Sequence, residues 1–193
     1  LAGQLLEAGF AVCSIDYRLI LRGGRLNECR RDVADAALWW NSKCEDWQLD
    51  PKQISFVGLS AGATLSIMTA ANDEVPTPER LVSVFGVYDF QYMRGLGHLL
   101  PKLLLETKER SSWDAHSVLN ITQPTCQTLL MHGDADLVVP VAQAHKLAEI
   151  RNTQDLPTSV EIYPNAPHGF FNYRTETADK AATVQTHLEG KSN

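Results

Sequence analysis

One short stretch constrains the fold of this chain more than any other. An apolar run at 53–57 leads directly into Gly58-Leu59-Ser60-Ala61-Gly62, and a helix-compatible run follows from Ala61. This G-x-S-x-G pattern between a strand and a helix is typical of a sharp turn that strains the serine backbone and favours small flanking residues. The stretch therefore predicts Ser60 as an exposed nucleophile at a helix N-terminus, where developing negative charge is favoured. The alternative is a chance match between common residues.

The rest of the sequence alternates between the two kinds of secondary structure. Apolar runs predict further strands at 10–15, 81–87, 128–131 and 159–163, and helical patterns cover 1–8, 28–45, 61–71, 140–151 and 175–188. Such alternation predicts a mostly parallel sheet with helices on both faces, in a single domain spanning 1–193. Residues 88–123 follow no single period, and we interpret them as a cap-like insertion over the sheet.

Composition excludes several classes of function. The net charge of −6, without any basic run, gives nucleic acid no electrostatic footprint, and no apolar run approaches the roughly 20 residues of a membrane span. The four cysteines lack metal-site spacing, so we expect reduced residues in or near the core and neither metal nor cofactor. Reduced cysteines slightly favour the cytoplasm. The compartment and the oligomeric state stay open.

Candidate partners for Ser60 follow the later strands. A serine hydroxyl needs a base, usually a histidine, which is oriented by a carboxylate. The strand at 128–131 is followed by Asp134 and Asp136, and the strand at 159–163 is followed by His168. In a parallel sheet these positions share the carboxyl edge, and the order serine, aspartate, histidine is that of α/β-hydrolases. The spacing alone leaves both aspartates open as the acid.

Four segments together carry a family resemblance. They are S-I-D-Y-R-L at 14–19, G-L-S-A-G at 58–62, H-G-D-A-D-L-V-V-P at 132–140 and H-G-F at 168–170. With them the chain resembles an α/β-hydrolase of the esterase/lipase group, close to acetylxylan and feruloyl esterase-like carboxylesterases. The resemblance implies Asp136, which precedes x-x-V-P, as the acid and His168 as the base. Asp134 would then shape the turn, and Arg18 of the D-Y-R-L segment would form a structural ion pair.

The resemblance also implies a reaction. We expect hydrolysis of a small-molecule carboxylic ester, with acylated carbohydrates as one substrate class, and the backbone N–H of Ala61 as an oxyanion donor. Phe90, Leu99 and Trp113 are expected to line an acyl or aryl pocket, although core packing explains each equally well. Two rivals are a prolyl-oligopeptidase-like peptidase or amidase and an inactive hydrolase fragment.

One family feature has no counterpart in the sequence. Hydrolases of this kind carry an H-G-G-type loop upstream of the D-Y-R-L strand, which supplies the second oxyanion donor. The strand bearing that loop would lie between the strands at 10–15 and 53–57, and its loss would leave a gap of about 9.5 Å. We therefore expect a fold truncated at its N-terminus, with two or three further strands before Leu1. A missing donor would cost roughly 10²–10³-fold in rate.

Overall fold

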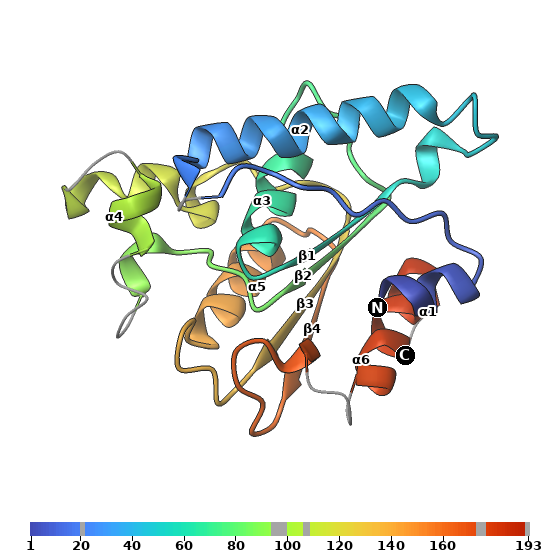
Figure 1. Cartoon of the computed structure of the whole chain (residues 1–193). Helices are drawn as coiled ribbons and strands as arrows, with labels where there is room; N and C mark the ends of the chain where they lie inside the picture. The colour runs from blue at the N-terminus through green and yellow to red at the C-terminus, as the bar shows by residue number, and fades with distance from the viewer. Residues whose placement is uncertain (20–21, 94–99, 106–108, 173–176, 192–193) are drawn as a thin grey trace.

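Four parallel strands form the centre of the molecule. The computed structural model describes residues 1–19, 22–93, 100–105, 109–172 and 177–191. The strands are β1 (Ser55–Leu59), β2 (Arg80–Val84), β3 (Gln127–Gly133) and β4 (Thr158–Tyr163). They pair in chain order, β1-β2-β3-β4, and every pair is parallel. All four carboxyl ends therefore meet at one edge of the sheet (Figure 1).

The alternation of side chains along the strands divides the core in two. Leu81 and Leu130 belong to one buried cluster, whereas their strand neighbours Val82 and Leu129 belong to the other. Successive residues of a strand point to opposite faces, so a strand that is apolar throughout can feed both clusters. This explains why the predicted strands read as continuous apolar runs.

Helices cover both faces of the sheet. The first cluster receives side chains from α2 (Leu26–Lys43), α3 (Ala61–Ala70) and α5 (Ala142–Thr153). The second receives them from α1 (Ala2–Glu7) and α6 (Thr177–Leu188). In Figure 1, α2 lies across the outside of α3, while α1 and α6 lie together on the opposite side. Each of these helices was expected from the sequence, within a few residues at its ends.

The expected strand at 10–15 is wrong. These residues form no strand, and Ile15 is 39% exposed. A strand requires a neighbour for its backbone groups, and among the described residues β1 pairs only with β2. The apolar run therefore does not join the described sheet, and Cys13, which we expected in or near the core, is exposed. The segment is attached to α2 by the ion pair of Arg18 and Asp32, 2.7 Å apart.

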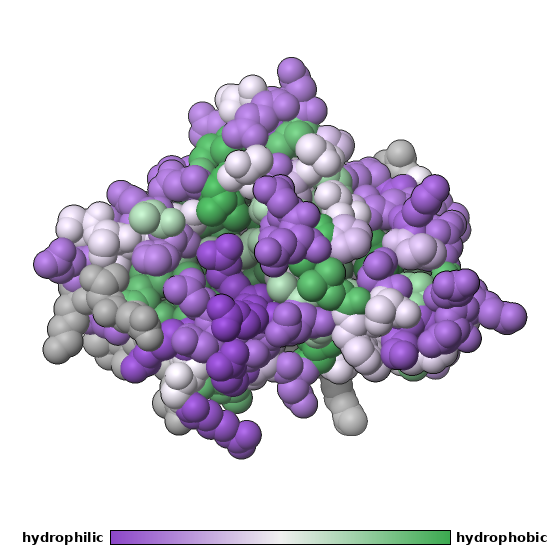
Figure 2. Space-filling model, turned by 90° about the horizontal axis from the view of Figure 1, so that it is seen from above, coloured by the Kyte–Doolittle hydropathy of each residue, from purple (hydrophilic) through white to green (hydrophobic). Residues whose placement is uncertain are grey.

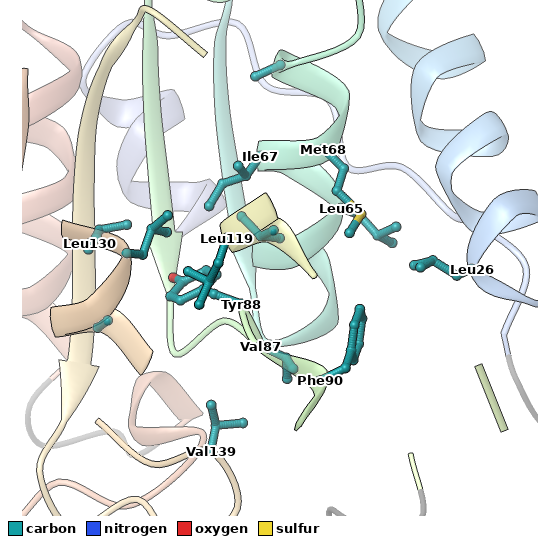
Figure 3. Close-up of a cluster of buried hydrophobic side chains, with 14 of the residues drawn as sticks. Leu26, Leu65, Ile67, Met68, Val87, Tyr88, Phe90, Leu119, Leu130 and Val139 are labelled. Atoms are coloured by element: carbon teal, nitrogen blue, oxygen red, sulfur yellow. The ribbon is translucent and has the colours of Figure 1, made fainter. Parts of the chain in front are cut away.

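Short helical turns replace a regular element between β2 and β3. They are η3 (Phe90–Tyr92), α4 (Leu100–Leu104), η5 (Arg110–Ser112), η6 (Asp114–His116) and η7 (Val118–Asn120). A further turn, η2 (Pro51–Gln53), precedes β1, and η8 (Phe170–Asn172) follows β4. The first cluster extends into this segment: in Figure 3, Phe90 and Leu119 lie with Leu65 of α3. The described residues of this segment thus contribute to the hydrophobic core.

The face of the molecule that is seen from above is predominantly polar (Figure 2). Seen from above, hydrophilic residues cover most of the visible face, and hydrophobic residues lie between them (Figure 2). Trp39 and Trp47 are about half exposed, and their rings meet edge to face with centroids 5.6 Å apart. None of the helices in the described ranges combines the length and apolar character needed to traverse a bilayer.

Candidate active site

Ser60 occupies the turn between β1 and α3. Its backbone has φ 52° and ψ −117°, an unfavourable conformation for a residue with a Cβ atom. The turn is held by a hydrogen bond from the Ser60 N–H to the Val84 carbonyl, at 2.9 Å. The strain and the tight turn together present the serine at the first turn of a helix, at the carboxyl edge of the sheet.

The two glycines that flank Ser60 are not equivalent. A Cβ atom at Gly58 would lie 2.2 Å from the Gly62 carbonyl oxygen, which leaves no room for any side chain. A Cβ atom at Gly62 would meet no described atom within 4 Å. The close approach of strand and helix therefore requires glycine at position 58 only, whereas the sequence pattern suggested a steric requirement on both sides.

His168 lies against the serine. It follows β4, and its Nε2 is 3.0 Å from Ser60 Oγ. The imidazole is 22% exposed, and the Phe85 ring packs against it with centroids 4.8 Å apart. Phe85 ends β2 in the left-handed region, at φ 41°, and its N–H donates to the Met131 carbonyl at 2.8 Å. The backbone reversal at Phe85 ends the strand earlier than the sequence predicted and places its ring beneath the histidine.

Asp136 lies on the other side of the imidazole. Its Oδ2 is 2.7 Å from His168 Nδ1, and its side chain is fully buried. Its Oδ1 accepts hydrogen bonds from the backbone N–H groups of Val138 and Val139, both at 2.8 Å. Burial by itself raises the pKa of the Asp136 carboxyl, but hydrogen bonds from His132, His168 and the two N–H groups outweigh it and hold that pKa well below its ordinary value. The carboxylate is therefore ionised at neutral pH.

The loops after β3 and β4 approach closely enough to bring these residues together. A Cβ atom at Gly133 would lie 2.1 Å from the Ala166 carbonyl oxygen, so only glycine fits between the loops. Asp134 closes the same junction, because its Oδ1 accepts the Asn165 N–H at 2.6 Å. Asp134 thus binds the loop backbone, and it is Asp136 that contacts His168.

Among the other expected site residues, Ala61 stays a predicted oxyanion donor. It opens α3, and the first N–H groups of a helix have no acceptor within the helix, so this one is available for an oxyanion. Phe90 and Trp113 are 2% and 0% exposed inside the first cluster. The expectation that they contact a substrate conflicts with this burial, because covered side chains present no surface to a ligand. Leu99 lies outside the described residues.

Sequence reasoning missed two neighbours of the imidazole and the carboxylate. His132 directly follows the strand predicted at 128–131 and received no role, yet its Nε2 is 3.3 Å from Asp136 Oδ2. Phe85 belonged to an apolar strand run without any sign of its turn. In the sequence, the contact between His132 and Asp136 is signalled only by their spacing of four residues.

Residues 1–150 match the BD-FAE family. The chain belongs to this family. The match includes Ser60 and Asp136, and the relationship to α/β-hydrolase esterases that the sequence segments indicated is confirmed. His168 lies beyond the matched residues.

Mycobacterial proteins are similar to this BD-FAE chain in sequence. It is 26% identical to esterase LipC of Mycobacterium tuberculosis over 189 residues, which cover 86% of this chain and 47% of that protein. It is 27% identical to the probable carboxylic ester hydrolase LipM of the same organism, over 88% of this chain and 44% of that protein. The chain therefore spans about half the length of the curated relatives it matches.

Solved structures share the fold. A truncated form of a carbohydrate esterase from gut microbiota superposes with a TM-score of 0.81 at 23% identity, covering 98% of this chain and 78% of that one. An acetyl ester-xyloside bifunctional hydrolase from Caldicellulosiruptor lactoaceticus gives 0.75 at 20% identity, covering 92% and 71%. The expected α/β-hydrolase fold is thereby confirmed.

Proposed function

We propose that this protein is a serine hydrolase of carboxylic esters that works through an acyl-enzyme. The observation that carries the proposal is the continuous relay from Ser60 Oγ to His168 Nε2, at 3.0 Å, and from His168 Nδ1 to Asp136 Oδ2, at 2.7 Å. Both distances lie within the range expected of a nucleophile, its base and the group that orients the base. The names of the mycobacterial relatives point to the same reaction class.

The relay assigns each proton in the first half of the reaction. The buried carboxylate of Asp136 accepts a hydrogen bond from the N–H at His168 Nδ1, so Nε2 carries no proton and can take the proton of Ser60. Ser60 Oγ then bonds to the ester carbonyl carbon, and the carbonyl oxygen becomes an oxyanion near the Ala61 N–H. The C–O bond to the alcohol breaks, and the proton on Nε2 leaves with the alcohol. The acyl group remains on Ser60.

The second half repeats these roles with water. His168 Nε2 takes a proton from a water molecule whose oxygen attacks the acyl carbon, and the same proton returns to Ser60 Oγ as the carboxylic acid departs. The partial exposure of the imidazole, 22%, is compatible with such access of water. Neither half requires a redox change or an external oxidant.

The substrate class we propose is an acylated small molecule, with acylated carbohydrates tested first. The support is the likeness in fold to the carbohydrate esterase and the acetyl ester-xyloside hydrolase. The test is a panel of p-nitrophenyl acetate, butyrate and octanoate beside an acetylated xyloside and a feruloylated sugar, with a p-nitroanilide as the amide control. We expect ester cleavage that is lost in Ser60→Ala. Cleavage of the anilide in preference to the esters would favour a peptidase or amidase instead.

A further inference from the structure

His132 has surroundings unlike those of an ordinary core histidine. It lies in β3, is 0% exposed, and its Nε2 is 2.9 Å from the Val139 carbonyl oxygen and 3.3 Å from Asp136 Oδ2. Its Nδ1 is buried and has no hydrogen-bond partner among the described residues. The imidazole thus faces two acceptors at one nitrogen and none at the other.

This geometry determines the tautomer. A carbonyl oxygen can only accept a hydrogen bond, so Nε2 must carry the proton that points to Val139. A second proton on Nδ1 would create a buried N–H group that the described residues cannot satisfy, which is unfavourable. His132 is therefore an Nε2–H donor directed at the Asp136–Val139 turn.

The same turn holds the carboxylate from its other side. Val139 donates its N–H to Asp136 Oδ1 at 2.8 Å while its carbonyl accepts from His132. His132 thus holds the carbonyl of the residue whose N–H binds Oδ1. The Nε2–H of His132 also lies against Oδ2, the oxygen that faces His168. Among the described residues, His132 and His168 are the titratable side chains that contact the Asp136 carboxylate.

We propose that His132 is a positioning residue for Asp136 in the ester hydrolysis proposed above, on which this inference rests. Its Nε2–H, shared between the Val139 carbonyl and Oδ2, fixes the direction in which the carboxylate meets His168. It also takes up part of the negative charge on Oδ2. His132 is fully buried and so presents no surface to a substrate.

The test uses two variants of matched size. His132→Leu removes the donor, whereas His132→Gln places an amide N–H at a similar reach. Loss of a hydrogen bond to a charged group should lower kcat of His132→Leu about 10- to 100-fold. KM should stay within about twofold of the wild type, because no substrate contact is lost. His132→Gln should recover most of kcat. Equal losses in the two variants, or a changed KM with kcat intact, would overturn the inference.

The pH profile separates positioning from simple loss of packing. With the donor removed, Oδ2 carries more negative charge and stabilises the imidazolium of His168 more strongly. The acidic limb of kcat/KM in His132→Leu should therefore move to higher pH, and His132→Gln should restore it. A uniform loss at every pH, without movement of the limb, would indicate a structural role only and would contradict the proposal.

Two further measurements keep the outcome distinguishable if His132→Leu folds poorly. Nitrogen NMR of the wild-type histidines should find His132 as the Nε2–H tautomer at neutral pH, and a proton on Nδ1 would overturn the inference without any variant. Ser60→Ala tests the proposed function separately. If Ser60→Ala abolishes hydrolysis while His132→Leu keeps full kcat, only the role of His132 is refuted. If Ser60→Ala retains hydrolysis, the proposed function fails and this inference with it.

Discussion

Replacement of Asp136 by asparagine changes one atom and should reverse the tautomer of His168. The amide oxygen of the variant can accept the N–H groups of Val138 and Val139, which lie 2.8 Å from Oδ1. Turning the amide over would set its NH₂ against both donors and lose two hydrogen bonds, at about 1–3 kcal/mol each. The amide NH₂ must therefore occupy the place of Oδ2, 2.7 Å from His168 Nδ1.

That orientation places a donor opposite Nδ1. Nδ1 then has to accept, so the imidazole proton moves to Nε2, 3.0 Å from Ser60 Oγ, where it can no longer take the serine proton. The same loss in serine proteases lowers kcat about 10⁴-fold. The contact from His132, at 3.3 Å, opposes this amide orientation, but it is a single and longer contact against the two 2.8 Å bonds to Oδ1.

The assay compares Asp136→Asn with Asp134→Asn in p-nitrophenyl acetate hydrolysis. We expect kcat of Asp136→Asn to be about 10⁴-fold lower than that of the wild type. Cooperative unfolding transitions of both variants serve as the control that both are folded. Asp134→Asn should stay within a few-fold of the wild type, because its amide oxygen can still accept the Asn165 N–H that Asp134 Oδ1 accepts at 2.6 Å. Near-normal activity in Asp136→Asn, or a 10⁴-fold loss in Asp134→Asn, would refute the assignment of the acid.

Three further predictions concern stability. Gly58→Ala should lower the free energy of unfolding by about 3 kcal/mol, because the new Cβ would lie 2.2 Å from a backbone oxygen. Gly62→Ala should change the free energy of unfolding little. Equal midpoints of urea unfolding in the two variants would contradict this. Arg151→Leu should cost about 2–5 kcal/mol in thermal or urea unfolding, because the carbonyls of Pro124 and Cys126 lose their guanidinium donors. Folding lowers the pKa of the Asp136 carboxyl. The contribution of this carboxyl to the free energy of unfolding is therefore complete above about pH 4 and is lost on further acidification. Between pH 6 and pH 3, Asp136→Asn should consequently lose less stability than the wild type.

The sheet and the relay residues could be predicted because local sequence determines them. Alternating apolar residues such as Leu81 and Val82 feed opposite faces, so a continuous apolar run reads as a buried parallel strand. Ser60 and His168 each follow such a strand, and parallel strands bring their carboxyl ends together regardless of the distance along the chain. The choice of Asp136 over Asp134 depended on the family resemblance, because both follow β3.

Other features depend on neighbours that the sequence does not reveal. The run at 10–15 has the composition of a strand but pairs with no strand among the described residues. Phe90 and Trp113 were ambiguous because an aromatic side chain that packs in a core has the same sequence signal as one that lines a pocket. The contact of His132 with Asp136 arises from the turn at Val139, which only the folded backbone defines.

The most direct test of the account is mass spectrometry of the protein after reaction with a fluorophosphonate. We expect one adduct per chain, on the peptide that contains Ser60, because His168 Nε2 can remove the serine proton from 3.0 Å. The adduct should be absent in Ser60→Ala and form far more slowly in His168→Ala. A wild-type protein that is unlabelled at Ser60, or labelled equally fast without His168, would contradict the proposed nucleophile and base.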